Sequence, residues 1–105
     1  MDRIDELMKR DGTHEKDNER KALFHIVANN DELYKLQNSV YDFEDHSIRP
    51  EILESGICTS SKTLIAIGFN LYNGYPTESL LNCFSCLDAK NFEIVIQALR
   101  IRLNM

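Results

Sequence analysis

A charge-free segment, residues 63–77, constrains the fold of this chain more than any other feature. Residues 64–72 within it are apolar on every side when they are placed on a helix, and Gly74 and Pro76 then prevent the helix from continuing. A helix that is apolar all round must be covered by other elements. The sequence therefore predicts an apolar central helix over about residues 61–73 with the rest of the chain packed around it.

Elsewhere the apolar residues recur at intervals of three and four, which is typical of amphipathic helices. This spacing predicts a short helix and a loop within residues 1–18, a helix over 18–29, a helix over 31–43, and two more after Thr77 and Asp88. A short turn of helix starts at Pro50. The expected helix caps are Asp17 or Asn18, Ser60 or Ser61, Thr77 and Asp88. The helix after Thr77 is expected to bury one side, made of Leu80, Leu81, Phe84 and Leu87.

The predicted fold class is all-α: a compact bundle of about six or seven short helices. With 105 residues, the chain has the length of one domain, here residues 1–105. Hydrophobic residues make up 43%, which is enough for a core without disulfides or metal.

The net charge is −5, and the charge is unevenly placed. Residues 1–54 hold 14 Asp/Glu against 8 Lys/Arg, whereas residues 55–105 hold 3 against 4. An acidic surface repels phosphate, so we expect no direct binding of nucleic acid. The acidic half could attract a basic partner, mimic nucleic acid, or only keep the protein soluble.

The sequence shows no apolar leader and no membrane-length apolar run. Its three cysteines are therefore expected to be reduced thiols. These features predict a protein of a bacterial cytoplasm that does not contact a membrane.

One motif could carry chemistry, and it also has a plain structural interpretation as two small buried apolar residues one turn apart. Cys83 and Cys86 form a C-x-x-C pair, but zinc would need two further ligands, for which only Cys58 and His46 are candidates. The pair also lies too late in its predicted helix for a redox dithiol. We therefore expect no metal and no cofactor, although a small cysteine-dependent metal or redox protein stays an alternative.

The chain contains no phosphate-binding glycine loop and no recognisable nucleophile or base motif, so we predict that it is not an enzyme. With catalysis excluded, we predict that the protein acts by binding another protein. The excess of acidic side chains in residues 31–54 favours this segment as the binding surface. We expect Tyr34 and Tyr41, seven residues apart on one helix, to flank acidic side chains there. The candidate protein-binding residues are Tyr34, Tyr41, Asp42, Glu44 and Asp45.

Several segments in the same order resemble a family of short proteins of unknown function from Gram-positive bacteria and their phages or mobile elements. They are Glu19-Arg-Lys-Ala-Leu-Phe24, Tyr41-Asp-Phe43, Ile48-Arg-Pro-Glu-Ile-Leu53, Thr59-Ser-Ser61, Phe69-Asn-Leu-Tyr-Asn-Gly-Tyr75 and Ala98-Leu-Arg-Ile-Arg-Leu103. The resemblance supplies no catalytic residues. Its context implies a phage or mobile-element protein that inhibits a host protein, for example a defence or CRISPR nuclease, by occluding its surface.

Overall fold

The computed structural model describes residues 2–105, and helices dominate this part of the chain. The elements follow in the order α1 (Arg3–Asp11), α2 (Asn18–Ala28), α3 (Asp31–Lys35), α4 (Gln37–Val40), β1 (Tyr41–Asp42), β2 (Ser47–Ile48), the 3-10 helix η1 (Pro50–Glu54), α5 (Thr59–Asn73), α6 (Leu80–Ser85) and α7 (Ala89–Leu103). The prediction of a small all-helical bundle is confirmed. Within residues 2–105 no helix combines the length and the apolar character that crossing a bilayer requires.

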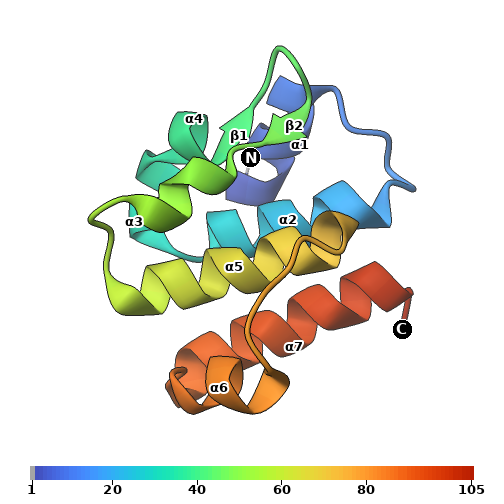
Figure 1. Cartoon of the computed structure of the whole chain (residues 1–105). Coiled ribbons are helices and arrows are strands. Elements are labelled where there is room, and N and C mark those ends of the chain that lie inside the picture. The colour runs from blue at the N-terminus through green and yellow to red at the C-terminus, as the bar shows by residue number, and fades with distance from the viewer. Residues whose placement is uncertain (1) are drawn as a thin grey trace.

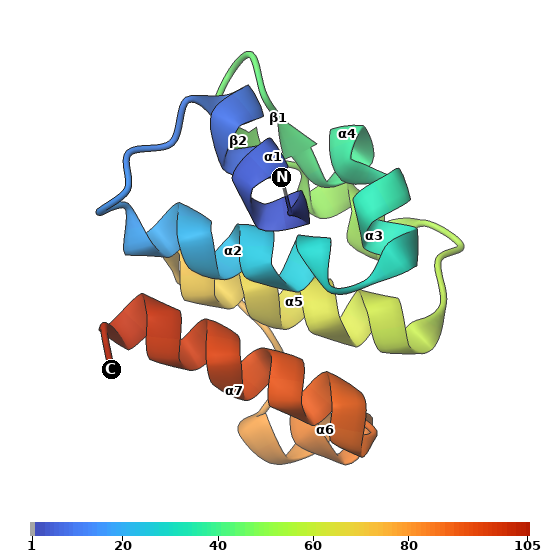
Figure 2. The same cartoon turned by 180° about the vertical axis from the view of Figure 1, so that it is seen from behind.

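The elements form three tiers (Figures 1 and 2). At one end lie α1, α3, α4 and the short hairpin made by β1 and β2; α2 and α5 form the middle; α7 and α6 form the other end. The core runs through the middle tier, where α2 packs against α1, α3, α5 and α7.

The helix predicted over 61–73 is present as α5 and contributes Leu64, Ile65 and Phe69 to the core. The central position, however, belongs to α2. Six of its eleven residues are buried, and their small and large side chains let four neighbouring helices approach. One side of α5 is only half-covered, and Leu71 and Tyr72 on it remain half-buried.

Most helix ends follow local sequence rules. Asp17 and Asp88 cap α2 and α7 as predicted, each accepting a hydrogen bond from the backbone N–H three residues on. Gly12 and Gly74 end α1 and α5 in the left-handed conformation that glycine adopts without strain.

Two cap predictions are wrong. Ser79, not Thr77, caps α6, and α5 begins after Cys58 rather than after Ser60 or Ser61. Cys58 makes no side-chain capping bond. Its backbone N–H instead donates to the Glu32 carboxylate at 3.1 Å, so a contact with a distant element fixes the start of this helix.

The single helix predicted over 31–43 is also wrong. The segment breaks into α3 and α4 at Leu36, and the chain then turns into the β1–β2 hairpin, in which Tyr41 pairs with Ile48 and Asp42 with Ser47. The break exposes Leu36, whereas Leu33 and Val40 stay buried.

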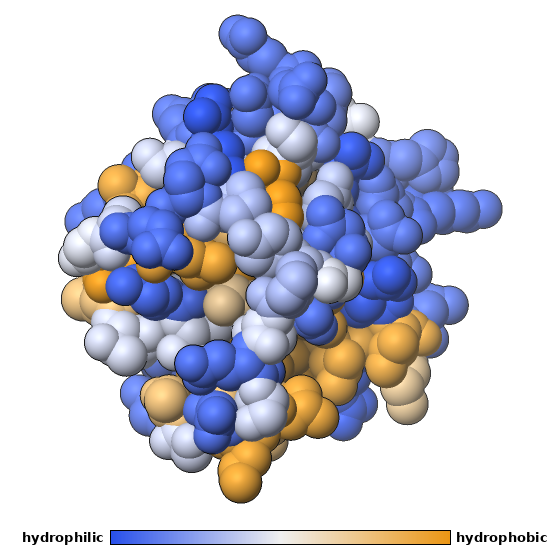
Figure 3. Space-filling view, in the orientation of Figure 1, coloured by the Kyte–Doolittle hydropathy of each residue, from blue (hydrophilic) through white to orange (hydrophobic). Residues whose placement is uncertain are grey.

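The apolar side predicted for α6 is only partly covered by the core, because Phe84 and Leu87 pack against it whereas Leu80 and Leu81 do not. Leu80 and Leu81 are 72% and 79% exposed, and Phe92 at the start of α7 is 41% exposed. Cys83 is the residue of α6 that is buried. In the space-filling view, apolar side chains gather at the lower edge of the molecule, over α6 and α7 (Figure 3).

Candidate functional site

The predicted acidic residues lie in the turn of the hairpin, at the end of the molecule opposite α6. Asp42 Oδ1 accepts hydrogen bonds from the backbone N–H groups of Glu44 and Asp45, both at 3.0 Å. These bonds lower the pKa of the Asp42 carboxyl, with a smaller contribution from Arg49. The turn therefore holds its shape with Asp42 ionised.

An aromatic cluster fixes this hairpin to the core. The Tyr41 ring meets Phe24 of α2 edge-on at 5.2 Å and Phe43 edge-on at 4.9 Å, measured between ring centroids. Phe24 and Tyr41 are fully buried, and Phe43 packs beside them. Edge-to-face contacts of this kind add to the stabilisation from burial. The hairpin is consequently a fixed part of the fold and not a loose loop.

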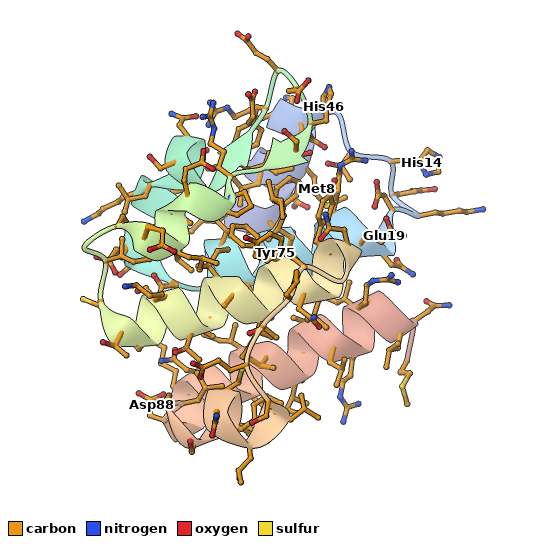
Figure 4. The ribbon with its side chains drawn as sticks, in the orientation of Figure 1. Met8, His14, Glu19, His46, Tyr75 and Asp88 are labelled. Carbon is orange, nitrogen blue, oxygen red and sulfur yellow. The ribbon has the colours of Figure 1, made fainter. Side chains whose placement is uncertain are left out.

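A buried polar cluster lies on the other side of Tyr41. The Asp11 carboxylate, at the end of α1, accepts hydrogen bonds from the Tyr41 hydroxyl at 2.9 Å and from Thr13 at 2.5 Å. His46 Nδ1 lies 2.7 Å from the same carboxylate, and Arg20 Nε lies 3.6 Å from it. His46 has a left-handed backbone, with φ of 56°, that closes the turn. Figure 4 shows it at the hairpin end of the molecule, far from Asp88.

The cluster shifts the ionisation of its members. Burial alone would raise the pKa of the Asp11 carboxyl, but the hydrogen bonds from Thr13, His46 and Tyr41, together with Arg20, outweigh burial and lower it. Burial, with the nearby Asp11 charge, raises the pKa of the Tyr41 hydroxyl despite the hydrogen bond from Arg20. Asp11 is therefore a charged group inside the protein and Tyr41 a neutral one.

Local sequence patterns do not indicate this cluster, because its members come from α1, α2 and the hairpin. Only the fold brings together groups that are 30 and 35 residues apart. Gly12 is a residue type that commonly ends a helix, and it ends α1 here, but the neighbouring sequence does not indicate that Asp11 is buried.

The arginines around the hairpin are engaged in contacts of their own. Arg10 donates to Gln37 and Asn38, and its guanidinium lies 3.9 Å from the centre of the Phe43 ring. Arg20 pairs with Asp17 and the buried cluster. Arg49 pairs with Asp42 at 3.2 Å and with Glu51 at 3.8 Å.

Glu44 and Asp45 differ from the carboxylates that these arginines hold. Both are exposed at the tip of the turn, and neither forms an ion pair with any residue in the 2–105 range. Asp45 accepts one hydrogen bond, from the Ser47 hydroxyl at 3.1 Å. The tip thus presents two negative charges that no described cation neutralises.

The two tyrosines do not form the predicted exposed pair. Tyr41 is 1% exposed, so its prediction as a surface residue is wrong: the chain leaves the helix at this residue and turns the ring inward. Tyr34 is half-buried on α3, where its hydroxyl donates to Glu6 and Arg3 lies over its ring. Asp42, Glu44 and Asp45 remain together, and Tyr34 belongs to the contact between α1 and α3.

The cysteines occupy three different environments. Cys83 is buried, and its Sγ lies 3.6 Å from the Glu78 carbonyl oxygen and 3.6 Å from the Thr77 hydroxyl. Cys86 and Cys58 are exposed, at the end of α6 and the start of α5. Among residues 2–105 no three His, Cys, Asp or Glu side chains are grouped so that they could share a metal ion.

An open hollow of about 550 Å³ lies between α3, α4 and η1. Leu36 and Ile52 contribute to its apolar lining, and Arg49 and Glu51 contribute to its polar lining. The buried Arg49 Nε has no hydrogen-bond partner in the part of the chain that is described. This hollow borders the hairpin through Arg49, whose other nitrogens hold Asp42 and Glu51.

Comparison with known proteins identifies the family of this chain but not its activity. A family model, described as a family of unknown function (DUF6075), matches residues 2–105, so the chain belongs to that family. No curated protein and no solved structure matches it.

Proposed function

We propose that this family member is a non-enzymatic protein-binding module that recognises a basic surface of another protein through the carboxylates of its hairpin turn. One observation carries the proposal: Glu44 and Asp45 are exposed at the tip of an anchored turn without an ion-pair partner in the described chain. Unpaired charges on a fixed support lose little conformational entropy when a partner binds.

Charge elsewhere in the chain supports the same kind of partner. Residues 1–54, which include the hairpin, α1, α3, α4 and the middle helix α2, hold 14 Asp/Glu against 8 Lys/Arg. Such a surface attracts a basic protein over a distance of about one Debye length, about 8 Å at physiological salt. Attraction of this kind accelerates encounter and orients the partner toward the hairpin.

The context implied by the sequence resemblance is part of this proposal. In it the protein acts in the cytoplasm of a Gram-positive bacterium, as a phage or mobile-element product. Its target is a host protein, for example a defence or CRISPR nuclease, and it inhibits that target by covering a basic surface. A basic groove that normally holds nucleic acid has the charge that this hairpin would fit.

The test is affinity capture from a Gram-positive host lysate at low salt, with immobilised wild type and with Glu44→Lys and Asp45→Lys as baits. Glu78→Lys is the matched control, since it reverses the same charge at an exposed position outside the hairpin. We expect one basic protein to be retained by the wild type and the control, lost from both hairpin variants, and released as salt is raised. Equal retention by all four baits would contradict the proposal.

A further inference from the structure

The face of α6 and α7 that points away from the core carries large apolar side chains. Leu80, Leu81 and Leu103 are 72%, 79% and 56% exposed, and Phe92 is 41% exposed. Phe84 meets Phe92 edge-on at 5.5 Å between centroids, so the side chains of the two helices form one surface. Single exposed leucines are common, but an apolar patch of this kind on a water-facing surface marks an interaction site.

Helix α7 has three distinct sides. Ile94, Val95 and Ala98 face the core. A second side is apolar and made of Phe92, Ile96, Leu99 and Leu103 at intervals of four, three and four; Phe92 and Leu103 are exposed, and Ile96 and Leu99 between them are half-buried. This spacing is the one that lets two helices pack along a common seam. The third side is polar and contains Glu93, Gln97 and Arg100.

The spacing of the outward stripe is the same when it is read from either end. A second α7 that runs antiparallel therefore places Phe92 opposite Leu103 and Ile96 opposite Leu99, and the two-fold axis repeats both contacts. Each of the four apolar side chains of the stripe then contacts an apolar side chain of the other copy.

The charges beside the stripe favour the same antiparallel arrangement. Glu93 and Arg100 are both exposed on the polar side of α7, and Arg100 has no ion pair within residues 2–105. In an antiparallel pair, positions on the same flank of the two seams face each other, so Glu93 of one copy lies near Arg100 of the other. The two-fold axis makes this pairing twice.

The arrangement of α6 and α7 and the charge of this half of the chain also favour an antiparallel contact between two copies. In both cartoons α6 lies below the N-terminal half of α7, and none of the described elements lies below the C-terminal half (Figures 1 and 2). An antiparallel copy would bring its α6, with Leu80 and Leu81, beside that open half. Residues 55–105 carry 4 Lys/Arg against 3 Asp/Glu, so copies that meet here avoid the repulsion between their acidic halves.

We infer that the apolar face of α6 and α7 is the interface of a symmetric homodimer, in which two α7 helices pack antiparallel with α6 at both ends of the seam. The dimer holds its two hairpins on the outer sides, because hairpin and interface lie at opposite ends of each copy (Figure 1). This inference is independent of the proposed function, since a monomer could still bind a partner through the hairpin.

The first test is sedimentation velocity and light scattering of the whole chain over a wide concentration range. We expect a species of twice the 12.2 kDa chain mass that dissociates on dilution. Leu81→Glu and Leu103→Glu place a charge at exposed positions, so they should leave helicity intact and weaken the dimer by more than about a hundredfold. Leu36→Glu, at an exposed large apolar residue between α3 and α4 and away from the proposed interface, is the matched control and should still dimerise. A wild type that stays monomeric at every concentration would overturn the inference.

The second test addresses the antiparallel arrangement. Glu93→Arg and Arg100→Glu should each weaken the dimer on the order of tenfold, because each creates two like-charge contacts. The double variant Glu93→Arg/Arg100→Glu restores opposite charges and should regain most of the affinity. A dimer in which the double variant is weakened by the sum of the two single changes would exclude this helix pairing.

Discussion

The Tyr41 hydroxyl donates a hydrogen bond to the Asp11 carboxylate at 2.9 Å and thereby joins the end of α1 to the start of the hairpin. Both residues are buried, Tyr41 at 1% and Asp11 at 6% exposure. A buried carboxylate is stable only when its oxygens are satisfied, and here Tyr41, Thr13 and His46 satisfy them. The position of the proposed binding turn therefore depends on this contact.

The contact can be removed by changing Tyr41 or by changing Asp11, and the two changes should lower the free energy of unfolding by different amounts. Tyr41→Phe keeps the ring but loses the hydrogen bond to Asp11 and the one from Arg20 Nε, for an expected cost of about 1–2 kcal/mol in the free energy of unfolding. Asp11→Ala leaves Tyr41, His46 and Arg20 without their shared partner and should cost about 2–4 kcal/mol. Urea denaturation of the two variants and the double variant measures both costs and their coupling. Strictly additive effects would mean that the two groups do not interact.

Acid should destabilise the protein through Asp11. Its pKa is lower in the folded than in the unfolded protein, so the unfolded state takes up the proton first as pH falls. The contribution of Asp11 is complete above the unfolded value, about 3.9, and is lost as pH falls through the lower folded value. Asp11→Asn cannot titrate, so its unfolding free energy should depend less steeply on pH below about pH 4. An unchanged slope in pH-dependent denaturation would contradict the role given to this carboxylate.

Three leucines should differ in how much their side chains contribute to the free energy of unfolding. Leu64 is fully buried, so Leu64→Ala should cost about 2–5 kcal/mol. Leu71 lies on the half-covered side of α5, so Leu71→Ala should lower the free energy of unfolding by less, about 1–2 kcal/mol. Leu81 is 79% exposed, and Leu81→Ala should change stability by no more than about 0.5 kcal/mol. Thermal and urea denaturation would test the order, and a large loss at Leu81 in the monomer would mean that α6 is part of the core.

Gly68 marks the close approach of α5 to α2. A Cβ added at this position would lie 3.3 Å from Leu23 Cδ1 and 3.4 Å from Ile26 Cδ1. Gly68→Ala should therefore be tolerated within about 1 kcal/mol, since better helix propensity offsets the crowding. Gly68→Leu cannot be accommodated and should cost more than about 3 kcal/mol. Equal stability of the alanine and leucine variants would show that the two helices are not in close contact here.

The parts of the fold that depend on neighbouring residues could be predicted from the sequence. Asp17, Asp88, Gly12 and Gly74 act within one turn of helix, so their chemistry is readable from the chain itself. The all-helical class followed from the spacing of apolar residues for the same reason.

The hairpin could not be predicted, because contacts distant in sequence decide it. Leu33, Leu36, Val40 and Phe43 fit a helix by spacing, but Phe24, Asp11 and Arg20 hold Tyr41 and Phe43 in another conformation. Tertiary packing here outweighs local propensity. The acidic residues of the turn, Asp42, Glu44 and Asp45, could be named in advance as candidates, but the anchor beneath them could not.

The exposure of Leu80 and Leu81 could not be predicted for a related reason. Spacing shows that Leu80, Leu81 and Phe84 share a side of a helix, but it does not show whether that side meets the core or the solvent. The inference that a second copy covers this side is what would reconcile the pattern with the structure.

The most direct test of the proposed function is a chemical-shift titration of the ¹⁵N-labelled protein with the partner that the wild type captures at low salt. We expect the largest shifts at residues 42–47, a dissociation constant that weakens as salt is raised, and no comparable shifts for Glu44→Lys. Shifts confined to other parts of the chain, with unchanged affinity of Glu44→Lys, would contradict the account of the hairpin as the binding site.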